Sequence, residues 1–221
     1  IALLTATGFS AILLFFLSVA FGLPMPLMAV QLLWLNLVAN GMQDVALAFE
    51  PKEGDELTRP PRKPSEPIFG FKVVEHVLVA GTAMGLIAFT AYAAALNAGV
   101  EHAMAQNLTL MLLVLFGNVH ALSSRSATRS IFTMNYFGNR FLAAAVPGAL
   151  LLHLIALHIP GLSGVLGLAP IPLETFGLLV LGALGFLAVE EAHKFVARRL
   201  EARDKTARHR AASNARHSPA E

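Results

Sequence analysis

The chain has 221 residues, of which 56% are hydrophobic and only 14% are charged, and its mean hydropathy is +0.64. A surface this apolar suits lipid, so the composition indicates an integral membrane protein and argues against a soluble globular domain. The absence of cysteine excludes a disulfide scaffold and any thiolate metal site.

The chain starts with Ile1 inside an apolar run, without the basic segment that opens a signal peptide. We therefore expect a piece of a longer protein with an N-terminal part before Ile1. Six apolar runs follow, each near the roughly 20 residues that a helix needs to cross the hydrocarbon core. They cover residues 1–21, 27–49, 71–96, 106–122, 141–159 and 173–196.

These runs predict an all-α fold, a polytopic membrane bundle of about six transmembrane helices within residues 1–197. We expect the first two runs to form an antiparallel hairpin, because only a short Gly/Pro turn joins them. Small residues in the third run, including Gly81 and Gly85, predict close helix packing. The basic tail, residues 198–221, is expected to be disordered.

The connections differ sharply in charge. If the six runs alternate, all 16 Lys and Arg residues fall on the side that holds residues 50–70, residues 123–140 and the C-terminus. By the positive-inside rule that side is cytoplasmic. The prolines of residues 50–67 predict an extended tether there, and the uncharged segment 160–172 is expected to be a loop on the opposite side.

The second run is unusual because polar residues interrupt it. On an α-helix, Asn36, Asn40 and Asp44 would be successive i, i+4 neighbours on one face, with Gln43 beside them. Polar groups at bilayer depth are costly and usually face a protein interior or a wet cavity. Gly41 would let the helix loosen and offer backbone carbonyls to a ligand, as in the broken helices of transporters.

Several segments of this sequence closely resemble P-type cation-transporting ATPases, in the calcium-pump-like branch and in bacterial form. The segments are Gly22-Leu23-Pro24, Val30-Gln31-Leu32-Leu33-Trp34-Leu35-Asn36-Leu37-Val38, Gly41, Phe49-Glu50-Pro51 and Arg59-Pro60-Pro61-Arg62. The resemblance implies the C-terminal transmembrane region from the fifth membrane helix onward, in a bacterial plasma membrane.

The resemblance also implies a cation site between these helices. Asn36 falls on a ligand position of the family, whereas Asn40, Ala11 and Gly117 stand where calcium pumps carry carboxylates. Calcium prefers several charged oxygens, so calcium specificity is in doubt, and a monovalent ion or a proton stays open. We predict Asn36, Asn40 and Asp44 as metal ligands, with Gln43, Thr7 and Ser10 as possible additions.

The phosphorylation segment Asp-Lys-Thr-Gly-Thr and a nucleotide-binding domain are missing from this sequence. We therefore expect no ATP hydrolysis by this chain alone and no cofactor in it. By resemblance, the complete pump uses ATP and Mg²⁺. The expected partners are membrane lipid, the transported cation, and the N-terminal helices and cytoplasmic domains of the same pump, with no nucleic acid.

Other interpretations remain open at this point. The chain could be a six-helix secondary transporter or channel subunit, or a structural bundle with a degenerate ion site. Asn36 and Asn40 could serve only to hydrogen-bond neighbouring helices and hold the bundle together. Thr7 and Ser10 could hydrogen-bond the carbonyls of their own helix. Asn118 and His120 lie two apart, so at most one points to the site. His76 is predicted to be interfacial, and Glu190, His193 and Lys194 are predicted to be solvated residues at a helix end.

Overall fold

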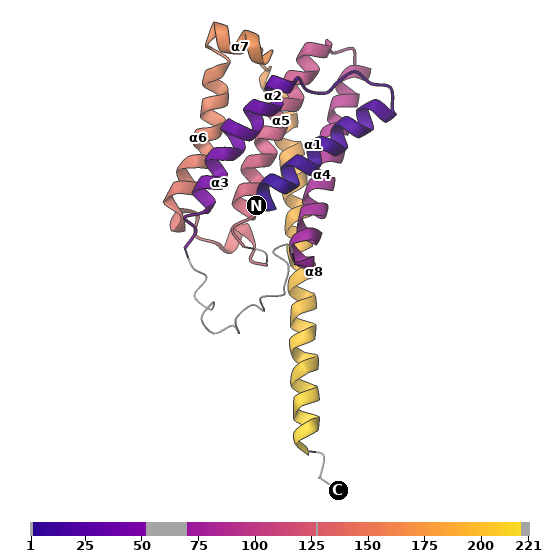
Figure 1. Cartoon of the computed structure of the whole chain (residues 1–221), viewed down its shortest axis with the longest axis vertical. Helices are drawn as coiled ribbons and strands as arrows, with labels where there is room; N and C mark the ends of the chain where they lie inside the picture. The colour runs from indigo at the N-terminus through magenta and orange to yellow at the C-terminus, as the bar shows by residue number, and fades with distance from the viewer. Residues whose placement is uncertain (1, 52–69, 127, 218–221) are drawn as a thin grey trace.

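The computed structural model describes residues 2–51, 70–126 and 128–217, and every regular element in these ranges is helical. The elements are α1 (Ala2–Ala20), α2 (Ala29–Trp34), the π-helical η1 (Leu35–Asn40), α3 (Gly41–Leu47), α4 (Phe71–Asn97), α5 (His102–Ser123), the 3-10 turns η3 (Ile131–Thr133) and η4 (Tyr136–Gly138), α6 (Arg140–Ala156), α7 (Pro160–Leu166) and α8 (Leu173–His217). The predicted all-α fold is confirmed (Figure 1). Most of the predicted proline-rich tether, residues 52–69, lies outside the described residues.

Within the described ranges, four helices are long and apolar enough to cross a membrane. They are α1, α4, α5 and the first part of α8, through windows Leu3–Ala20, Val73–Asn97, His102–Ser123 and Leu173–Leu200. α6 and α7 pass the same test together, but a bend of 99° separates them, so they add a fifth span only if the bent pair counts as one. The remaining predicted run, residues 27–49, is divided among α2, η1 and α3, each too short to span alone.

The second run nevertheless follows one continuous helical path. Trp34 and Gly41, which flank η1, both keep right-handed helical backbone angles. A π-helix bonds each N–H to the carbonyl five residues earlier, so it is wider and looser than an α-helix. The predicted loosening at Gly41 is confirmed, because the π-helical turn ends at Asn40, directly before that glycine.

Helix α1 packs mainly along α4, and the second run packs mainly on α5 and α6. The expectation that the first two runs pack as a hairpin is therefore wrong, although a short turn joins them. The glycines of α4 explain the preference of α1. A Cβ atom on Gly81 would lie 2.8 Å from the carbonyl oxygen of Ala6, and one on Gly85 would lie 3.0 Å from that of Ser10. The predicted close approach at these small residues is confirmed.

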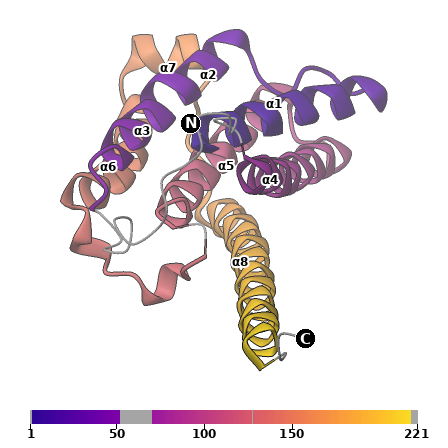
Figure 2. The same ribbon diagram turned by 60° about the horizontal axis from the view of Figure 1, so that its bottom comes forward.

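Helix α5 is the centre of the bundle. It contacts α1 and α4 on one side, α3 and α6 on the other, and α8 as well (Figure 2). Of its candidate span, 83% is buried, against 22% to 39% for the other three. Most polar side chains on α5 are therefore buried inside the protein, which suits a helix that carries functional groups.

The segment predicted as the 160–172 loop contains helix α7, which corrects that expectation. Pro160 occupies the first turn, where its missing N–H costs nothing, and Gly167 closes the helix in the left-handed conformation at φ +61°. The buried Gln31 side chain joins α7 to the second run. Its Nε2 donates to the Leu166 carbonyl at 2.9 Å, and its Oε1 accepts from the Met28 N–H at 2.8 Å.

Helix α8 continues to His217, well beyond the predicted end of the last run near Val196. The lower part of this helix projects from the bundle (Figure 1). Most of residues 198–221 are therefore helical in the structure, where disorder was expected. Ala, Arg, Lys and Glu dominate this stretch, and all four are strong helix formers. We call the end of the bundle from which α8 projects the basic end.

Candidate functional site

The polar residues of the second run are not buried alike. Asn40 and Gln43 are fully buried at 0% exposure, and Asp44 is half-buried. Asn36 is exposed. Asn40 and Asp44 therefore face inward at least in part, whereas Asn36 is exposed within the described residues, and its role as a ligand stays a prediction.

The π-helical turn changes the spacing of side chains along this part of the second run. The i, i+4 rule assumes 3.6 residues per turn, whereas a π-helix holds more residues in each turn. Asn36 and Asn40 both lie within η1, where four residues complete slightly less than one turn, so their angular offset differs from that in an α-helix. Asn40 and Asp44 lie on the two sides of Gly41, where the path returns to α-helix, and both face inward at least in part.

Two buried amide oxygens lie side by side at the contact between the second run and α5. Asn40 donates its Nδ2 to Thr7 Oγ1 at 3.4 Å, and Gln43 donates its Nε2 to Asn118 Oδ1. The remaining atoms, Asn40 Oδ1 and Gln43 Oε1, have no hydrogen-bond partner among the described residues. A buried oxygen without a donor is costly, and an electropositive ligand would offset that cost.

Gly117 of α5 provides the room for these oxygens. A Cβ atom there would lie 2.8 Å from Asn40 Oδ1 and 3.6 Å from Gln43 Oε1. Any side chain at position 117 would therefore displace the Asn40 oxygen. A glycine in a buried helix interior lowers helix propensity by about 1 kcal/mol relative to alanine, so its presence here fits a need for space.

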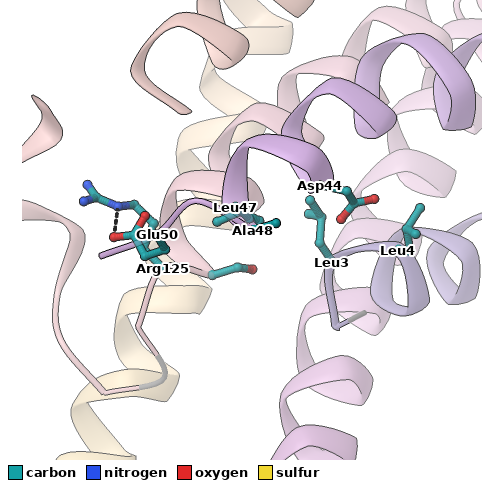
Figure 3. Close-up of a pocket in the computed structure, with 8 residues that line it drawn as sticks. Leu3, Leu4, Asp44, Leu47, Ala48, Glu50 and Arg125 are labelled. Carbon is teal, nitrogen blue, oxygen red and sulfur yellow. Dashed lines mark hydrogen bonds and ion pairs between the residues drawn. The ribbon is translucent and has the colours of Figure 1, made fainter. Parts of the chain in front are cut away.

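Asp44 lies one turn further toward the basic end. Its Oδ2 has no hydrogen-bond partner among the described residues. The carboxylate lines a pocket of about 390 Å³, and the ion pair between Arg125 Nε and Glu50 Oε1, at 2.8 Å, lies at the pocket's opposite end (Figure 3). Asn118 bonds Gln43, and His120 lies against Glu190, so neither side chain bonds Asp44 within the described residues.

The two hydroxyls of α1 bond their own helix. Thr7 Oγ1 lies 3.0 Å from the Leu3 carbonyl oxygen, and Ser10 Oγ donates to the Thr7 carbonyl at 2.7 Å. Both residues thus bond carbonyls of their own helix, which was the alternative to a role as ligands. Thr7 is still adjacent to the amides, because its oxygen accepts from Asn40. The Ser10 hydroxyl bonds within α1 and not to the second run, among the described residues.

Asn118 and His120 leave α5 in different directions, as their spacing predicts. Asn118 bonds Gln43 on the second run, whereas His120 Nδ1 lies 3.0 Å from Glu190 Oε1 on α8. The prediction that Glu190 and Lys194 are solvated is wrong. They are 2% and 0% exposed, because α5 and the 123–130 segment cover this part of α8.

Sequence reasoning also missed a polar contact that closes the second run. Asn139, at the start of α6, donates its Nδ2 to the Ala46 carbonyl at 2.9 Å and to Glu50 Oε2 at 2.8 Å. Arg125 binds the other oxygen of the same carboxylate. Glu50 thus ties the end of α3 to the segment between α5 and α6. The sequence signal that could have indicated this contact was Glu50, a charged residue directly after an apolar run.

The class of protein follows from a comparison with protein-family models. Residues 24–196 match the family described as "Cation transporting ATPase, C-terminus". The match covers most of the chain, so the chain belongs to this family. It is the C-terminal membrane domain of a P-type cation-transporting ATPase, and it is a multi-pass membrane protein. The resemblance read from the sequence is confirmed.

Individual relatives agree with this assignment. The chain is 34% identical over 160 residues to a calcium-transporting ATPase of Bacillus subtilis, an alignment that covers 72% of this chain and 18% of the relative. It is 30% identical over 204 residues to calcium-transporting ATPase 1 of Saccharomyces cerevisiae, which covers 91% and 21%. A probable cation-transporting ATPase F of Mycobacterium tuberculosis is 30% identical over 154 residues, covering 70% and 17%. The chain thus spans about a fifth of the length of these curated relatives.

Proposed function

We propose that Asn40, Gln43 and Asp44 supply oxygen ligands to a cation that an ATP-driven pump carries across the membrane. This chain would contribute the ion path, and further parts of the pump would bind ATP and Mg²⁺ and form the aspartyl phosphate. The pump would lie in a bacterial plasma membrane, with the basic end in the cytoplasm, where the positive-inside rule places Lys and Arg.

The observation that carries this proposal is the set of unpartnered oxygens beside Gly117. Asn40 Oδ1 and Gln43 Oε1 are buried between helices and accept no hydrogen bond from the described residues. An oxygen in that position has given up water without a replacement donor. A partly dehydrated cation would restore the lost interaction. The adjacent π-helical turn supports the same conclusion, because π-bulges occur frequently at functional sites.

The ligand chemistry bears on which cation is carried. The described set contains two neutral amides, one hydroxyl and one carboxylate, so its negative charge comes from Asp44. Sites that hold Ca²⁺ tightly usually combine several carboxylates. Two relatives are named calcium-transporting ATPases, so Ca²⁺ is one candidate for the ion that this chain carries, and a monovalent cation or a proton is another.

Asn36 enters the proposal through the rest of the pump. Its side chain is exposed, and so are its apolar neighbours Leu33 and Leu37, at 62% and 69%. We propose that a further membrane helix of the complete pump packs on this face. That helix would bury Asn36 and add ligands of its own. Thr7 and Ser10 would support the site from α1, and we do not propose them as primary ligands.

The decisive experiment replaces Asp44 with Asn in the full-length pump, reconstituted into vesicles. Phosphoenzyme formation from labelled ATP is measured against Ca²⁺, Na⁺, K⁺ and pH, each varied alone. We expect one cation to stimulate the wild type and the stimulation to be lost in D44N, because the variant keeps the shape but removes the charge. The matched control is E174Q, which neutralises an exposed acid at the start of α8.

The two alternatives give different results. If D44N and Asn40→Ala both retain the wild-type cation dependence, the second run is a structural element with a degenerate site. If the full-length protein forms no phosphoenzyme under any condition while it still moves ions, a secondary transporter or channel replaces the pump.

A further inference from the structure

We call the group formed by Asn40, Gln43 and Asp44 the amide site. A second group of polar side chains lies near the basic end, where α5 meets α4 and α8. His76 of α4, His120 of α5 and Glu190 of α8 each offer one ligand atom, and these three atoms lie within 4.8 Å of one another. The closest pair is His120 Nδ1 and Glu190 Oε1 at 3.0 Å. The rings of His76 and His120 are stacked with centroids 5.4 Å apart. We call these three residues the His–Glu cluster.

The His–Glu cluster is buried and incompletely bonded. His120 is 0% exposed and Glu190 is 2% exposed, and His76 is half-buried. His120 Nε2 and Glu190 Oε2 are both buried without a hydrogen-bond partner among the described residues. Burial of a carboxylate and an imidazole with free ligand atoms is expensive, so a structural hydrogen bond alone does not account for the arrangement.

The nearby lysine does not complete the cluster. Lys194 is fully buried, one turn after Glu190 on α8, but its Nζ donates to the carbonyls of Ser123 at 2.7 Å and Arg129 at 3.2 Å. Among the described residues, no Lys or Arg forms an ion pair with Glu190. The carboxylate thus keeps capacity for a positive ligand.

We propose that His76, His120 and Glu190 bind a borderline divalent metal ion of the Zn²⁺ type. Imidazole nitrogens with one carboxylate oxygen are a common ligand set for zinc, which takes four ligands in a tetrahedron. The residues come from three different helices, so the metal would clamp α4, α5 and α8 together at one end of the bundle.

The distances fit this chemistry after a small side-chain movement. Ligand atoms about 2.1 Å from a tetrahedral zinc ion are about 3.4 Å apart. The His120–Glu190 pair, at 3.0 Å, is already near that separation. His76 is half-buried on the rim of the cluster, so its ring has room to turn toward the pair.

A fourth ligand is available on α8. His193 follows Glu190 by three residues, and this spacing places both side chains on one helix face. Its ring centroid lies 5.7 Å from that of His76, and its Nε2 lies 3.4 Å from Glu75 Oε1. Both ring nitrogens of His193 are buried without a hydrogen-bond partner among the described residues, so either can bind a metal ion.

The metal site is distinct from the transport site. The amide site uses neutral oxygens on the second run, and the His–Glu cluster uses nitrogens and a carboxylate on α4, α5 and α8. The proposal therefore stands even if the pump's cation site lies elsewhere. It predicts a resident ion that stays with the protein through turnover, in contrast to a transported one.

The test measures zinc in the full-length protein, purified in detergent without a histidine tag, stripped with a chelator and titrated with Zn²⁺. We expect about one tightly bound zinc per chain in the wild type. His76→Gln and Glu190→Gln should each weaken binding at least tenfold, because each removes one ligand while keeping a polar side chain of similar size. Co²⁺ should give the intense visible absorption of four-coordinate cobalt in the wild type and lose it in H76Q.

Two controls keep the result interpretable. His158→Gln removes an exposed histidine in the turn after α6 and should leave zinc uptake unchanged, which separates the cluster from adventitious surface binding. D44N should also bind zinc normally, which separates the cluster from the transport site. The proposal is overturned if the wild type takes up no tightly bound zinc, or if H76Q and E190Q both bind it as the wild type does.

Discussion

The amide site and the His–Glu cluster are two buried polar groups that both involve helix α5. Both place side chains of α5 in the interior, and both leave buried ligand atoms without a hydrogen-bond partner among the described residues. They differ in chemistry. The amide site offers neutral oxygens from Asn40 and Gln43 beside one acid, whereas the cluster offers imidazole nitrogens and a carboxylate.

That difference separates two kinds of cation binding. Amide and hydroxyl oxygens resemble the water that a hard cation gives up, so they suit an ion that must enter and leave. Imidazoles suit borderline metals, which bind more tightly and stay. The backbone agrees, because the amide site adjoins the loosened turn η1, while the cluster joins the regular helices α4, α5 and α8.

The largest expected effect that separates the two regions comes from Gly117→Ala. The new methyl group would lie 2.8 Å from Asn40 Oδ1, and that flexible oxygen must move away. We expect the apparent affinity for the transported cation to fall at least tenfold, about 1.4 kcal/mol, in a phosphorylation assay. Zinc binding should not change, because the three atoms nearest the new methyl group belong to Asn40 and Gln43. A fall in zinc binding alone would contradict the separation.

A test of the scaffold that both regions share is Gly81→Ala. Its Cβ atom would meet the backbone oxygen of Ala6 at 2.8 Å, so α1 and α4 must move apart. We expect a loss of about 1 to 3 kcal/mol in stability, seen as a lower midpoint of thermal unfolding in detergent. The control is Gly177→Ala on α8, where no atom lies within 4 Å of the new methyl group. It should be neutral or stabilising, and equal effects of the two changes would refute the packing argument.

The contact of Glu50 with Arg125 and Asn139 belongs to the second run, which carries the amide site, and not to the helices of the cluster. Arg125→Gln removes the 2.8 Å ion pair that holds the end of α3, and it leaves Glu50 with Asn139. We expect a loss of about 1 to 2 kcal/mol, since hydrogen bonds to charged groups contribute that much when partly buried. Thermal unfolding and the cation dependence of phosphorylation measure it, with exposed Arg129→Gln as the control. Unchanged behaviour would show that the contact does not stabilise the second run.

The smallest expected effect is that of Thr7→Val. The hydroxyl bonds its own helix, and its bond from Asn40 is long at 3.4 Å. We expect a change below about 1 kcal/mol in both stability and cation affinity. A tenfold loss of cation affinity in T7V, with the fold intact, would make Thr7 a ligand and enlarge the amide site.

The sequence predicted the membrane fold because composition and run length respond directly to the lipid environment. It also predicted the loosened turn, because Gly41 and the amides of the second run break the pattern of an ordinary membrane helix. It could not show the π-helical turn around Asn36, since an i, i+4 rule assumes an α-helix throughout. It treated His76 as interfacial and Glu190 as a solvated residue at a helix end, because burial there depends on three helices that are distant in the sequence.

By itself, the sequence determined that this chain is a bundle of membrane helices, and its motifs identified the family of cation pumps. Those properties rest on local hydrophobicity and on short stretches of residues, which can be recognised one segment at a time. The tertiary structure alone decided that Asn40 and Gln43 meet Gly117, that Glu50 closes α3, and that His76, His120 and Glu190 converge. Such meetings depend on how helices pack, and the packing of distant segments is a property of the whole chain.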